Sequence, residues 1–176
     1  TRRSVERRSL RTADHTIFNS SLCYEAWNRE YGVSTDTTTI HNGVDTSMFA
    51  PRTDRPSEDY VLFVGDSRRK GLPAVLNYGG SGSYPVYVVG DVEEREGITP
   101  IGHVSQDRLA GLYAGAVATV HPAKFEAFGN VVLESLACGT PVVTTSQCGA
   151  SEILPADCGA VDVALETGIE QCHGVS

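Results

Sequence analysis

The chain has 176 residues, of which 40% are hydrophobic and 20% charged, and this is the composition of an ordinary globular protein. A chain of this length can bury a core without the help of disulfides or metals. The formal net charge of −8 argues against the broad basic face of a nucleic-acid-binding protein, so no nucleic-acid partner is expected. The five cysteines form no C-x-x-C pair, so metal-site spacing is missing and reduced thiols in a cytoplasmic protein are the simplest interpretation.

The first fifty residues predict a small α/β segment. Residues 2–14 are typical of the end of an amphipathic helix, residues 15–21 of a short strand, and residues 22–32 of a second helix that ends at Gly32. A β-branched strand over residues 37–43 then runs into an Asn-Gly turn.

Residues 51–59 (PRTDRPSED) are predicted to be a linker, because they are charged, contain two prolines and lack periodicity. They divide the chain into a segment over residues 1–50 and a domain over residues 51–176. No apolar run approaches the roughly 18 residues that a membrane span needs.

From Tyr60 onward, apolar strands alternate with helices. Strands are expected at residues 60–65, 84–90, 99–104, 117–122, 141–145 and 158–163. Helices are expected at residues 70–78, 105–116, 130–139 and 149–154, with Ser105 as an N-cap. This alternation predicts an α/β fold: a Rossmann-like parallel sheet with helices on both faces. Ligands of such sheets bind at the carboxyl ends of the strands, where GDSRRKG (65–71) and PAKFEAFGN (122–130) lie.

Two glutamates flank the start of the predicted helix at residues 130–139. Glu134 lies off the apolar stripe of that helix, and helical side chains lean toward the N-terminus, so its carboxylate is expected near the Gly129-Asn130 turn. Glu126 approaches the same turn from the strand side. Free N–H groups of the first helical turn attract anions, and carboxylates accept hydrogen bonds from hydroxyls. A ligand that is both sugar and phosphate suits this mixture.

The loop at residues 65–71 adds positive charge. Arg68 and Arg69 can grip a phosphate with two parallel hydrogen bonds, and Lys70 is a mobile point charge. The loop is not a P-loop, because Lys70 precedes the glycine, and GGSGSY (79–84) is no dinucleotide fingerprint.

At FEAFGNVVLESLACGTPVV (125–143) the chain resembles family 4 retaining glycosyltransferases of the GT-B fold, with their E-x7-E signature. HNGVDTSMFAP (41–51) is similar to the interdomain segment of that family, and FVGDSRRKG (63–71) to its strand and loop ending in Lys-Gly. The pattern Gly-x-Val, then Leu-x-x-Leu-Tyr, recurs in residues 102–113. The resemblance implies that residues 51–176 are the donor-binding half of a GT-B enzyme and that residues 1–50 are the end of its first domain.

The resemblance also implies roles for individual positions. Glu126 would contact the donor sugar and Lys70 would neutralise the leaving diphosphate, so these two residues form the catalytic set. Glu134 would bind the ribose of the nucleotide. The remaining substrate-binding residues are Gly65, Arg68, Arg69, Gly102, His103, Phe128, Gly129, Asn130 and Val131, with Gly102 and His103 facing the base.

Some positions depart from the family pattern. Asp66 stands where the family usually has an arginine, and Arg68 or Arg69 is the candidate replacement. Asp66 and the short loop favour an alternative function, a non-catalytic module that binds a nucleotide sugar or sugar phosphate; a nucleotide-sugar epimerase is a third option. No D-x-D pair occurs, so no metal is expected, and no cofactor beyond the nucleotide diphosphate sugar. His41, His103 and His121 are interpreted as loop or packing residues.

The expected partners are a nucleotide sugar, the rest of the first GT-B domain, and an acceptor that is a glycan or a lipid-linked molecule at the membrane surface. The expected location is the cytoplasm or the inner face of the membrane. The chain is expected to be a fragment that carries the donor half of the site and does not turn over alone.

Overall fold

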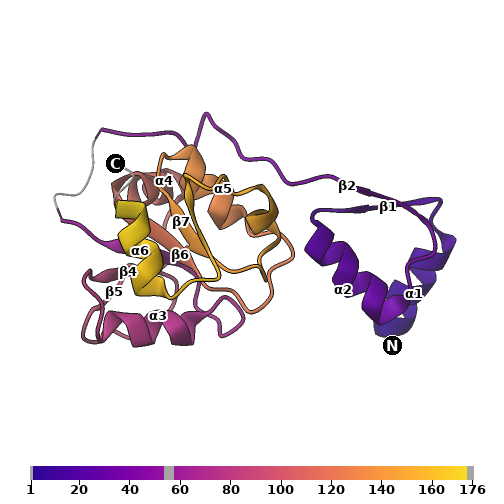
Figure 1. The fold of residues 1–176 in the computed structure, drawn as a ribbon, viewed down its shortest axis with the longest axis horizontal. Coiled ribbons are helices and arrows are strands. Elements are labelled where there is room, and N and C mark those ends of the chain that lie inside the picture. The colour runs from indigo at the N-terminus through magenta and orange to yellow at the C-terminus, as the bar shows by residue number, and fades with distance from the viewer. Residues whose placement is uncertain (1, 54–57, 174–176) are drawn as a thin grey trace.

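The structure, a computed structural model, describes residues 2–53 and 58–173 and divides into a small N-terminal part and a larger sheet domain (Figure 1). The small part consists of two helices and two strands: α1 (Arg2–Thr12), β1 (His15–Phe18), α2 (Ser21–Tyr31) and β2 (Asp36–Thr39). Strands β1 and β2 pair in parallel. As the sequence predicts, α2 ends at Gly32, whose φ of 66° suits a residue without Cβ.

The larger part holds a six-stranded sheet and its helices. Its strands are β3 (Val61–Val64), β4 (Val86–Val89), β5 (Ile98–Pro100), β6 (Ala118–His121), β7 (Val142–Thr144) and β8 (Gly159–Val161). Its helices are α3 (Leu72–Gly79), α4 (Gln106–Gly115), α5 (Asn130–Ala137), the 3-10 helix η1 (Gly149–Ile153) and α6 (Leu165–His173).

All strand pairs of this sheet are parallel, in the order β5-β4-β3-β6-β7-β8. The chain begins in the middle of the sheet at β3, builds outward to β5, and returns to the other side of β3 with β6. The connections from β3 and from β6 therefore leave in opposite directions. This reversal creates a crevice at the carboxyl ends of β3 and β6, which is where ligands bind in open α/β sheets.

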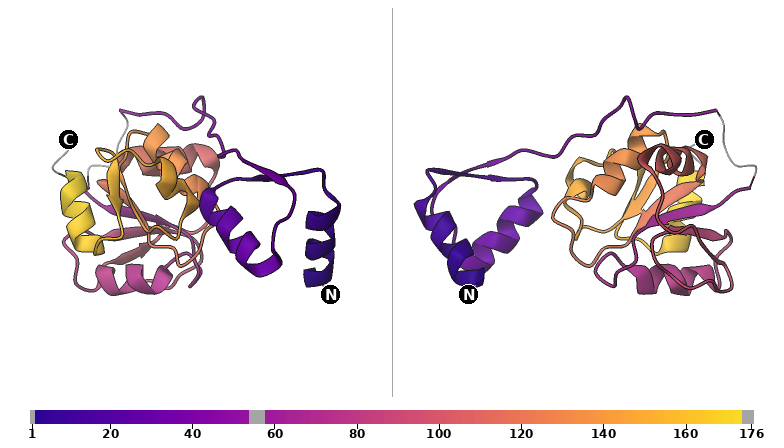
Figure 2. Two further views of the ribbon diagram at one scale, coloured as in Figure 1. Left: turned by 45° about the vertical axis from the view of Figure 1, so that its right-hand side comes forward. Right: turned by 180° about the vertical axis from the view of Figure 1, so that it is seen from behind.

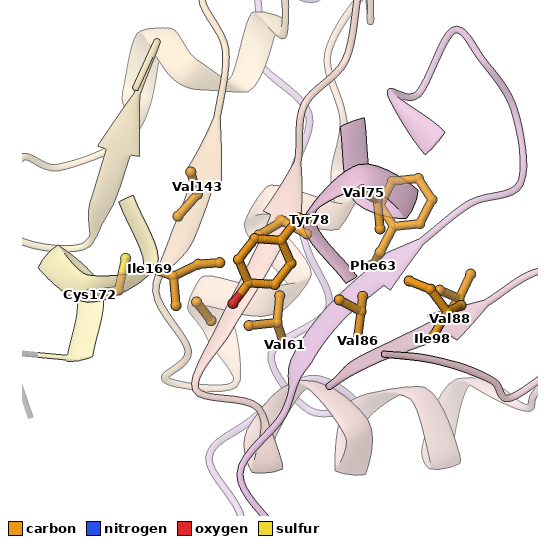
Figure 3. Close-up of a cluster of buried hydrophobic side chains, with 12 residues drawn as sticks. Val61, Phe63, Val75, Tyr78, Val86, Val88, Ile98, Val143, Ile169 and Cys172 are labelled. Carbon is orange, nitrogen blue, oxygen red and sulfur yellow. The ribbon is translucent and has the colours of Figure 1, made fainter. Parts of the chain in front are cut away.

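Helices cover both faces of the sheet (Figures 1 and 2), which confirms the predicted fold class. On one face, α3 contributes Val75 and Tyr78 and α6 contributes Ile169 and Cys172, packed against alternate residues of β3, β4, β6 and β7 (Figure 3). On the other face, α4 packs over Tyr60 and Leu62 and α5 packs over Val142. Side chains alternate between the two faces along a strand, so a strand buried on both sides must be apolar throughout, as VLFV is.

Several expected elements differ in detail. The expected strand 99–104 is the shorter β5, and the expected helix 149–154 is the five-residue 3-10 helix η1. Helix α6 was not expected, because it is short and has Gly168 in its middle. A Cβ at Gly168 would lie 2.6 Å from Val143 Cγ1, so glycine allows α6 to pack directly on β7. Part of the expected linker lies outside the described residues.

Helix α5 buries an unexpected polar residue. Val132 is fully buried, as its stripe predicts, but the second buried residue of the helix is Ser135. Its Oγ lies 2.8 Å from Thr119 Oγ1 and 3.0 Å from the Thr140 carbonyl oxygen. This small polar contact lets α5 approach β6 closely while leaving Glu134, the neighbouring residue, on the side that faces α4.

Candidate functional site

The two loops that the sequence marks, β3–α3 and β6–α5, follow the neighbouring strands at the crevice. The Lys124 N–H donates to the Arg69 carbonyl oxygen over 2.9 Å. At Gly71 (φ 93°) an added Cβ would lie 2.0 Å from the Pro122 carbonyl oxygen, so the loops touch through their backbones. Glycine is required there by both the left-handed conformation and the lack of space.

A cavity of about 420 Å³ lies between these loops. This volume is within the usual range for a small-molecule site, roughly 300–1,000 Å³. Its wall includes Arg69, Lys70, Glu126, Glu134 and the helix start from Phe128 to Val131. Thus the structure brings together the acidic pair, two cations and the first turn of α5. Asn19 and Asn42 reach the same cavity from the N-terminal part.

Hydrogen bonds to its side chain and to its backbone hold Glu126 in place. Its carboxylate Oε2 accepts a hydrogen bond from Arg69 Nη1 at 2.8 Å, and Arg69 also donates to the Phe125 carbonyl oxygen at 3.0 Å. The Glu126 backbone bonds to Gln147 and Gly149. Because the Arg69 side chain is 55% exposed, this ion pair adds little stability. The ion pair places a carboxylate and a guanidinium side by side in the cavity wall, where both can bind a ligand.

Glu134 lies on the opposite side of the helix start and is positioned by Tyr113 of α4. The Tyr113 hydroxyl donates to Glu134 Oε2 over 2.8 Å. Burial, with the adjacent carboxylate of Glu134, holds the pKa of Tyr113 well above its usual range, so the phenol stays a donor. Within residues 2–53 and 58–173, the other carboxylate oxygen of Glu134, Oε1, has no hydrogen-bond partner, which leaves it available for a ligand. The sequence contained this tyrosine in its Leu-x-x-Leu-Tyr pattern but gave it no role.

The first turn of α5 offers backbone donors to the cavity. Gly129 precedes the helix with φ of 95°, and none of the described side chains caps the helix start. Asn130 and Val131 line the cavity, so the N–H groups of this first turn are available there for anions or hydroxyl oxygens. The Val132 N–H is already bonded to the Gly129 carbonyl oxygen at 3.0 Å.

His121, the last residue of β6, was interpreted as a packing residue, but it lines the cavity. Its side chain is 1% exposed, and both ring nitrogens are buried without a hydrogen-bond partner among the described residues. Burial lowers its pKa to about 4; Glu126 opposes this shift, and Lys70 and Arg69 reinforce it. The imidazole is therefore neutral at pH 7. No sequence signal separates this histidine from a core residue.

Four expected site residues lie outside the cavity wall. Gly65 packs closely against the Lys70 side chain, since a Cβ built on Gly65 would lie 2.6 Å from Lys70 Cδ. Arg68 is exposed and does not line the cavity, so of the two candidate arginines the structure brings only Arg69 to Glu126. Gly102 and His103 follow β5 and do not line the cavity, and their role at the base stays a prediction.

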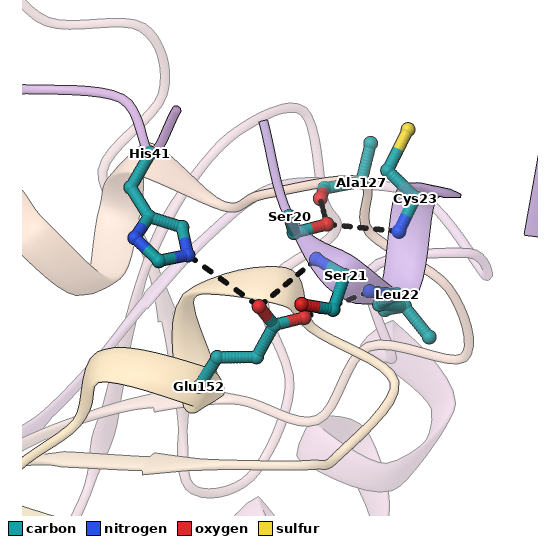
Figure 4. A network of polar contacts seen from close by, with 7 residues as sticks. All are labelled: Ser20, Ser21, Leu22, Cys23, His41, Ala127 and Glu152. Atoms are coloured by element: carbon teal, nitrogen blue, oxygen red, sulfur yellow. Dashed lines mark hydrogen bonds and ion pairs between the residues drawn. The ribbon is translucent and has the colours of Figure 1, made fainter. Parts of the chain in front are cut away.

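A polar network ties the N-terminal part to this end of the sheet (Figure 4). Glu152 of η1 accepts hydrogen bonds from the N–H groups of Ser21 and Leu22 at the start of α2, at 3.0 and 2.8 Å. The His41 ring nitrogen Nε2 lies 3.4 Å from the same carboxylate. The Ser20 hydroxyl donates to the Ala127 carbonyl oxygen at 2.5 Å, directly beside Glu126.

The fold is shared by solved glycosyltransferase structures. Sucrose-phosphate synthase from Thermosynechococcus elongatus superposes with a TM-score of 0.83 and 24% identity, over 99% of this chain and 54% of that one. HepE of Anabaena, solved in complex with UDP and glucose, superposes with a TM-score of 0.77 and 20% identity, over 98% of this chain and 55% of that one. The chain therefore shares the GT-B fold of these structures.

Sequence comparisons identify the family. Residues 82–159 match the model of the glycosyl transferases group 1, and residues 1–48 match that of glycosyltransferase family 4. D-inositol 3-phosphate glycosyltransferase of Nocardiopsis dassonvillei is 27% identical over 76% of this chain, and glycogen synthase of Mycobacterium tuberculosis is 28% identical over 80% of it. Residues 82–159 therefore form a group 1 glycosyltransferase domain and residues 1–48 part of a family 4 domain, and the chain spans about two fifths of the length of these curated relatives.

Proposed function

We propose that this chain is the donor-binding part of a retaining, metal-independent hexosyltransferase that takes a sugar from a nucleotide diphosphate sugar. The observation that carries the proposal is the convergence of Glu126 and Glu134 on the start of α5, with Arg69 and Lys70 facing them in one cavity. In the transfer, the bond between the anomeric carbon and the diphosphate oxygen breaks and a bond to an acceptor hydroxyl oxygen forms. The hydroxyl proton leaves with the diphosphate.

Each part of the cavity suits one part of such a donor. Glu134 Oε1 can accept from the ribose hydroxyls, and the N–H groups of α5 can donate to the diphosphate or to sugar hydroxyls. Lys70 and Arg69 supply positive charge where negative charge grows on the leaving diphosphate. Glu126 is placed to accept from the sugar ring.

The surroundings of Asp66 bear on the alternative of a non-catalytic module. Asp66, which favoured the module, is exposed and does not line the cavity, while Arg69 provides a guanidinium beside Glu126.

Within the described ranges, no three His, Cys, Asp or Glu side chains gather into a metal site, and no helix there has the length and apolarity to cross a bilayer. The acceptor and the cytoplasmic location stay predictions from the sequence.

Calorimetric titration of the chain with UDP, GDP, ADP and their hexose derivatives tests the proposal. We expect binding to at least one nucleotide, weakened about tenfold or more by Glu134→Ala and unchanged when Mg²⁺ is replaced by a chelator. The matched control is Glu170→Ala, which removes an exposed helical glutamate on α6. Binding that needs Mg²⁺, or that tolerates Glu134→Ala, contradicts the proposal.

A further inference from the structure

His121 and Asn19 are buried polar groups that the proposed donor site does not yet use. Both ring nitrogens of His121 and the Asn19 side-chain oxygen Oδ1 are buried without a partner among the described residues, and both residues line the 420 Å³ cavity. Buried polar atoms almost always have a hydrogen-bond partner, because leaving one unpaired costs about 1–3 kcal/mol. Two such groups at a single cavity indicate partners that arrive from outside the protein.

We propose that His121 and Asn19 form a subsite that binds hydroxyl groups of the donor's sugar ring. The inference rests on the proposed function and specifies which part of the donor these residues recognise. His121 reaches the cavity from the end of β6, and Asn19 reaches it from the segment between β1 and α2. The subsite is therefore built jointly by the sheet domain and the N-terminal part.

The charge state of His121 favours a hydroxyl over a phosphate. Its environment holds one carboxylate, Glu126, and two cations, Lys70 and Arg69, and its low pKa keeps the imidazole neutral. A neutral imidazole has one N–H donor and one lone pair, and the Asn19 oxygen is an acceptor. A sugar hydroxyl both donates and accepts, so it can satisfy either group, whereas a phosphate accepts only and would favour a protonated ring.

The position of the ring places the subsite beside Glu126. A Cβ built on Gly129 would lie 3.4 Å from Glu126 Cγ and 3.7 Å from His121 Nε2, so Gly129 separates the two side chains without a side chain of its own. Both ring nitrogens of His121 are buried, so a ligand reaches them only when a neighbouring side chain moves aside. Lys70, a long flexible side chain in the same wall, is the one that we expect to move.

The test compares nucleotide sugars with the bare nucleotide diphosphates. Calorimetry with UDP-glucose, GDP-mannose, ADP-glucose and the matching diphosphates first finds the pair that the unmodified chain binds. For that pair, His121→Leu and Asn19→Ala are each expected to weaken the nucleotide sugar about tenfold and to leave the diphosphate unchanged. His121→Gln, which keeps a donor and an acceptor, is expected to restore part of the loss.

Tyr78→Phe is the matched control. It also removes a buried atom without a partner among the described residues, the Tyr78 hydroxyl, but Tyr78 lies on α3, packs against the sheet and does not line the cavity. A second readout is the nitrogen resonance of His121 in ¹⁵N-labelled chain, which should shift on addition of the nucleotide sugar and stay in place with the diphosphate.

The outcomes separate the two proposals. Equal loss of nucleotide sugar and diphosphate in the variants, or no loss of either, overturns the subsite while the donor-site proposal stands. If the unmodified chain binds none of these nucleotides, the proposed function fails, and the subsite assignment fails with it.

Discussion

At the residue scale, the contact between Tyr113 and Glu134 explains how a helical glutamate becomes a fixed acceptor. Glu134 is only partly buried, and an unrestrained glutamate there would sample several rotamers. The Tyr113 hydroxyl fixes Oε2, and Tyr113 itself is fully buried, with its carbonyl oxygen bonded to Thr140 Oγ1 at 2.6 Å. A buried core residue thus positions a carboxylate at the cavity.

Tyr113→Phe removes this hydroxyl. We expect the free energy of unfolding to fall by about 1 kcal/mol and nucleotide binding to weaken several-fold, because Glu134 gains rotamer freedom. Tyr60→Phe is the control, since the Tyr60 hydroxyl is also buried and donates to the Leu112 carbonyl oxygen at 2.7 Å, away from the cavity. Urea unfolding and calorimetry measure the two effects. Equal binding losses in both variants would show that Tyr113 has no special role at Glu134.

His121 gives the unfolding free energy a pH dependence. Its pKa is about 4 in the folded chain and 6.5 in the unfolded chain, so the unfolded state takes up a proton first as the pH falls. The stability that this group contributes is complete above pH 6.5 and is lost as the pH drops toward 4, by an amount on the order of 3 kcal/mol. His121→Gln should flatten the pH dependence of the urea midpoint in this window. An unchanged slope would mean that the buried imidazole does not titrate as described.

At the scale of elements, main-chain contacts between the β3–α3 and β6–α5 loops set the separation of the two sides of the cavity. Gly71 makes the backbone contact with Pro122, and the Lys124 N–H bonds to Arg69. The two loops are thus joined through main-chain atoms.

Gly71→Ala should disrupt this contact. A Cβ cannot be placed 2.0 Å from a carbonyl oxygen, and φ of 93° is unfavourable for alanine, so we expect a loss of about 3 kcal/mol and of nucleotide binding. Gly111→Ala is the control, because Gly111 lies inside α4 with open space around it and should gain about 0.5–1 kcal/mol. Thermal and urea unfolding compare them; a neutral Gly71→Ala would refute the described contact between the loops.

The sequence predicts the order and type of these elements because alternation and caps are local properties. The apolar strands, Ser105 as N-cap and Gly32 at a helix end are all visible in a few residues each. The pairing of Glu134 with Tyr113, the choice of Arg69 over Arg68, and the position of His121 at the cavity depend on how distant segments pack. Helix α6 was missed for the same reason, because the role of Gly168 depends on its packing against Val143, which is distant in the sequence.

At the scale of the whole molecule, the N-terminal part and the sheet domain are joined through a helix start. Glu152 accepts from the first N–H groups of α2, so the negative charge lies at the positive end of the helix dipole. Burial acts to raise the pKa of Glu152, but the hydrogen bonds from Ser21 and Leu22 outweigh it and the pKa lies below its usual value. The carboxylate therefore stays charged at neutral pH and fastens the two parts together.

Glu152→Ala should loosen this junction without unfolding the sheet. We expect faster amide exchange in α2, corresponding to about 1 kcal/mol of local stability, and little change in β3 or β6. Glu166→Ala is the control, because Glu166 accepts from Ser83 within the sheet domain. Hydrogen exchange followed by mass spectrometry distinguishes them. Equal protection of α2 in both variants would show that Glu152 does not hold the helix.

The main-chain contact between Gly71 and Pro122 has a consequence for engineering. The separation of the cationic and acidic walls is independent of the side chains mounted on them, so residues such as Arg68 or Lys124 can be exchanged without resizing the gap. A library that varies those flanking positions and leaves the two backbones alone should yield folded variants, while substitutions at the point of contact should mostly yield misfolded chains.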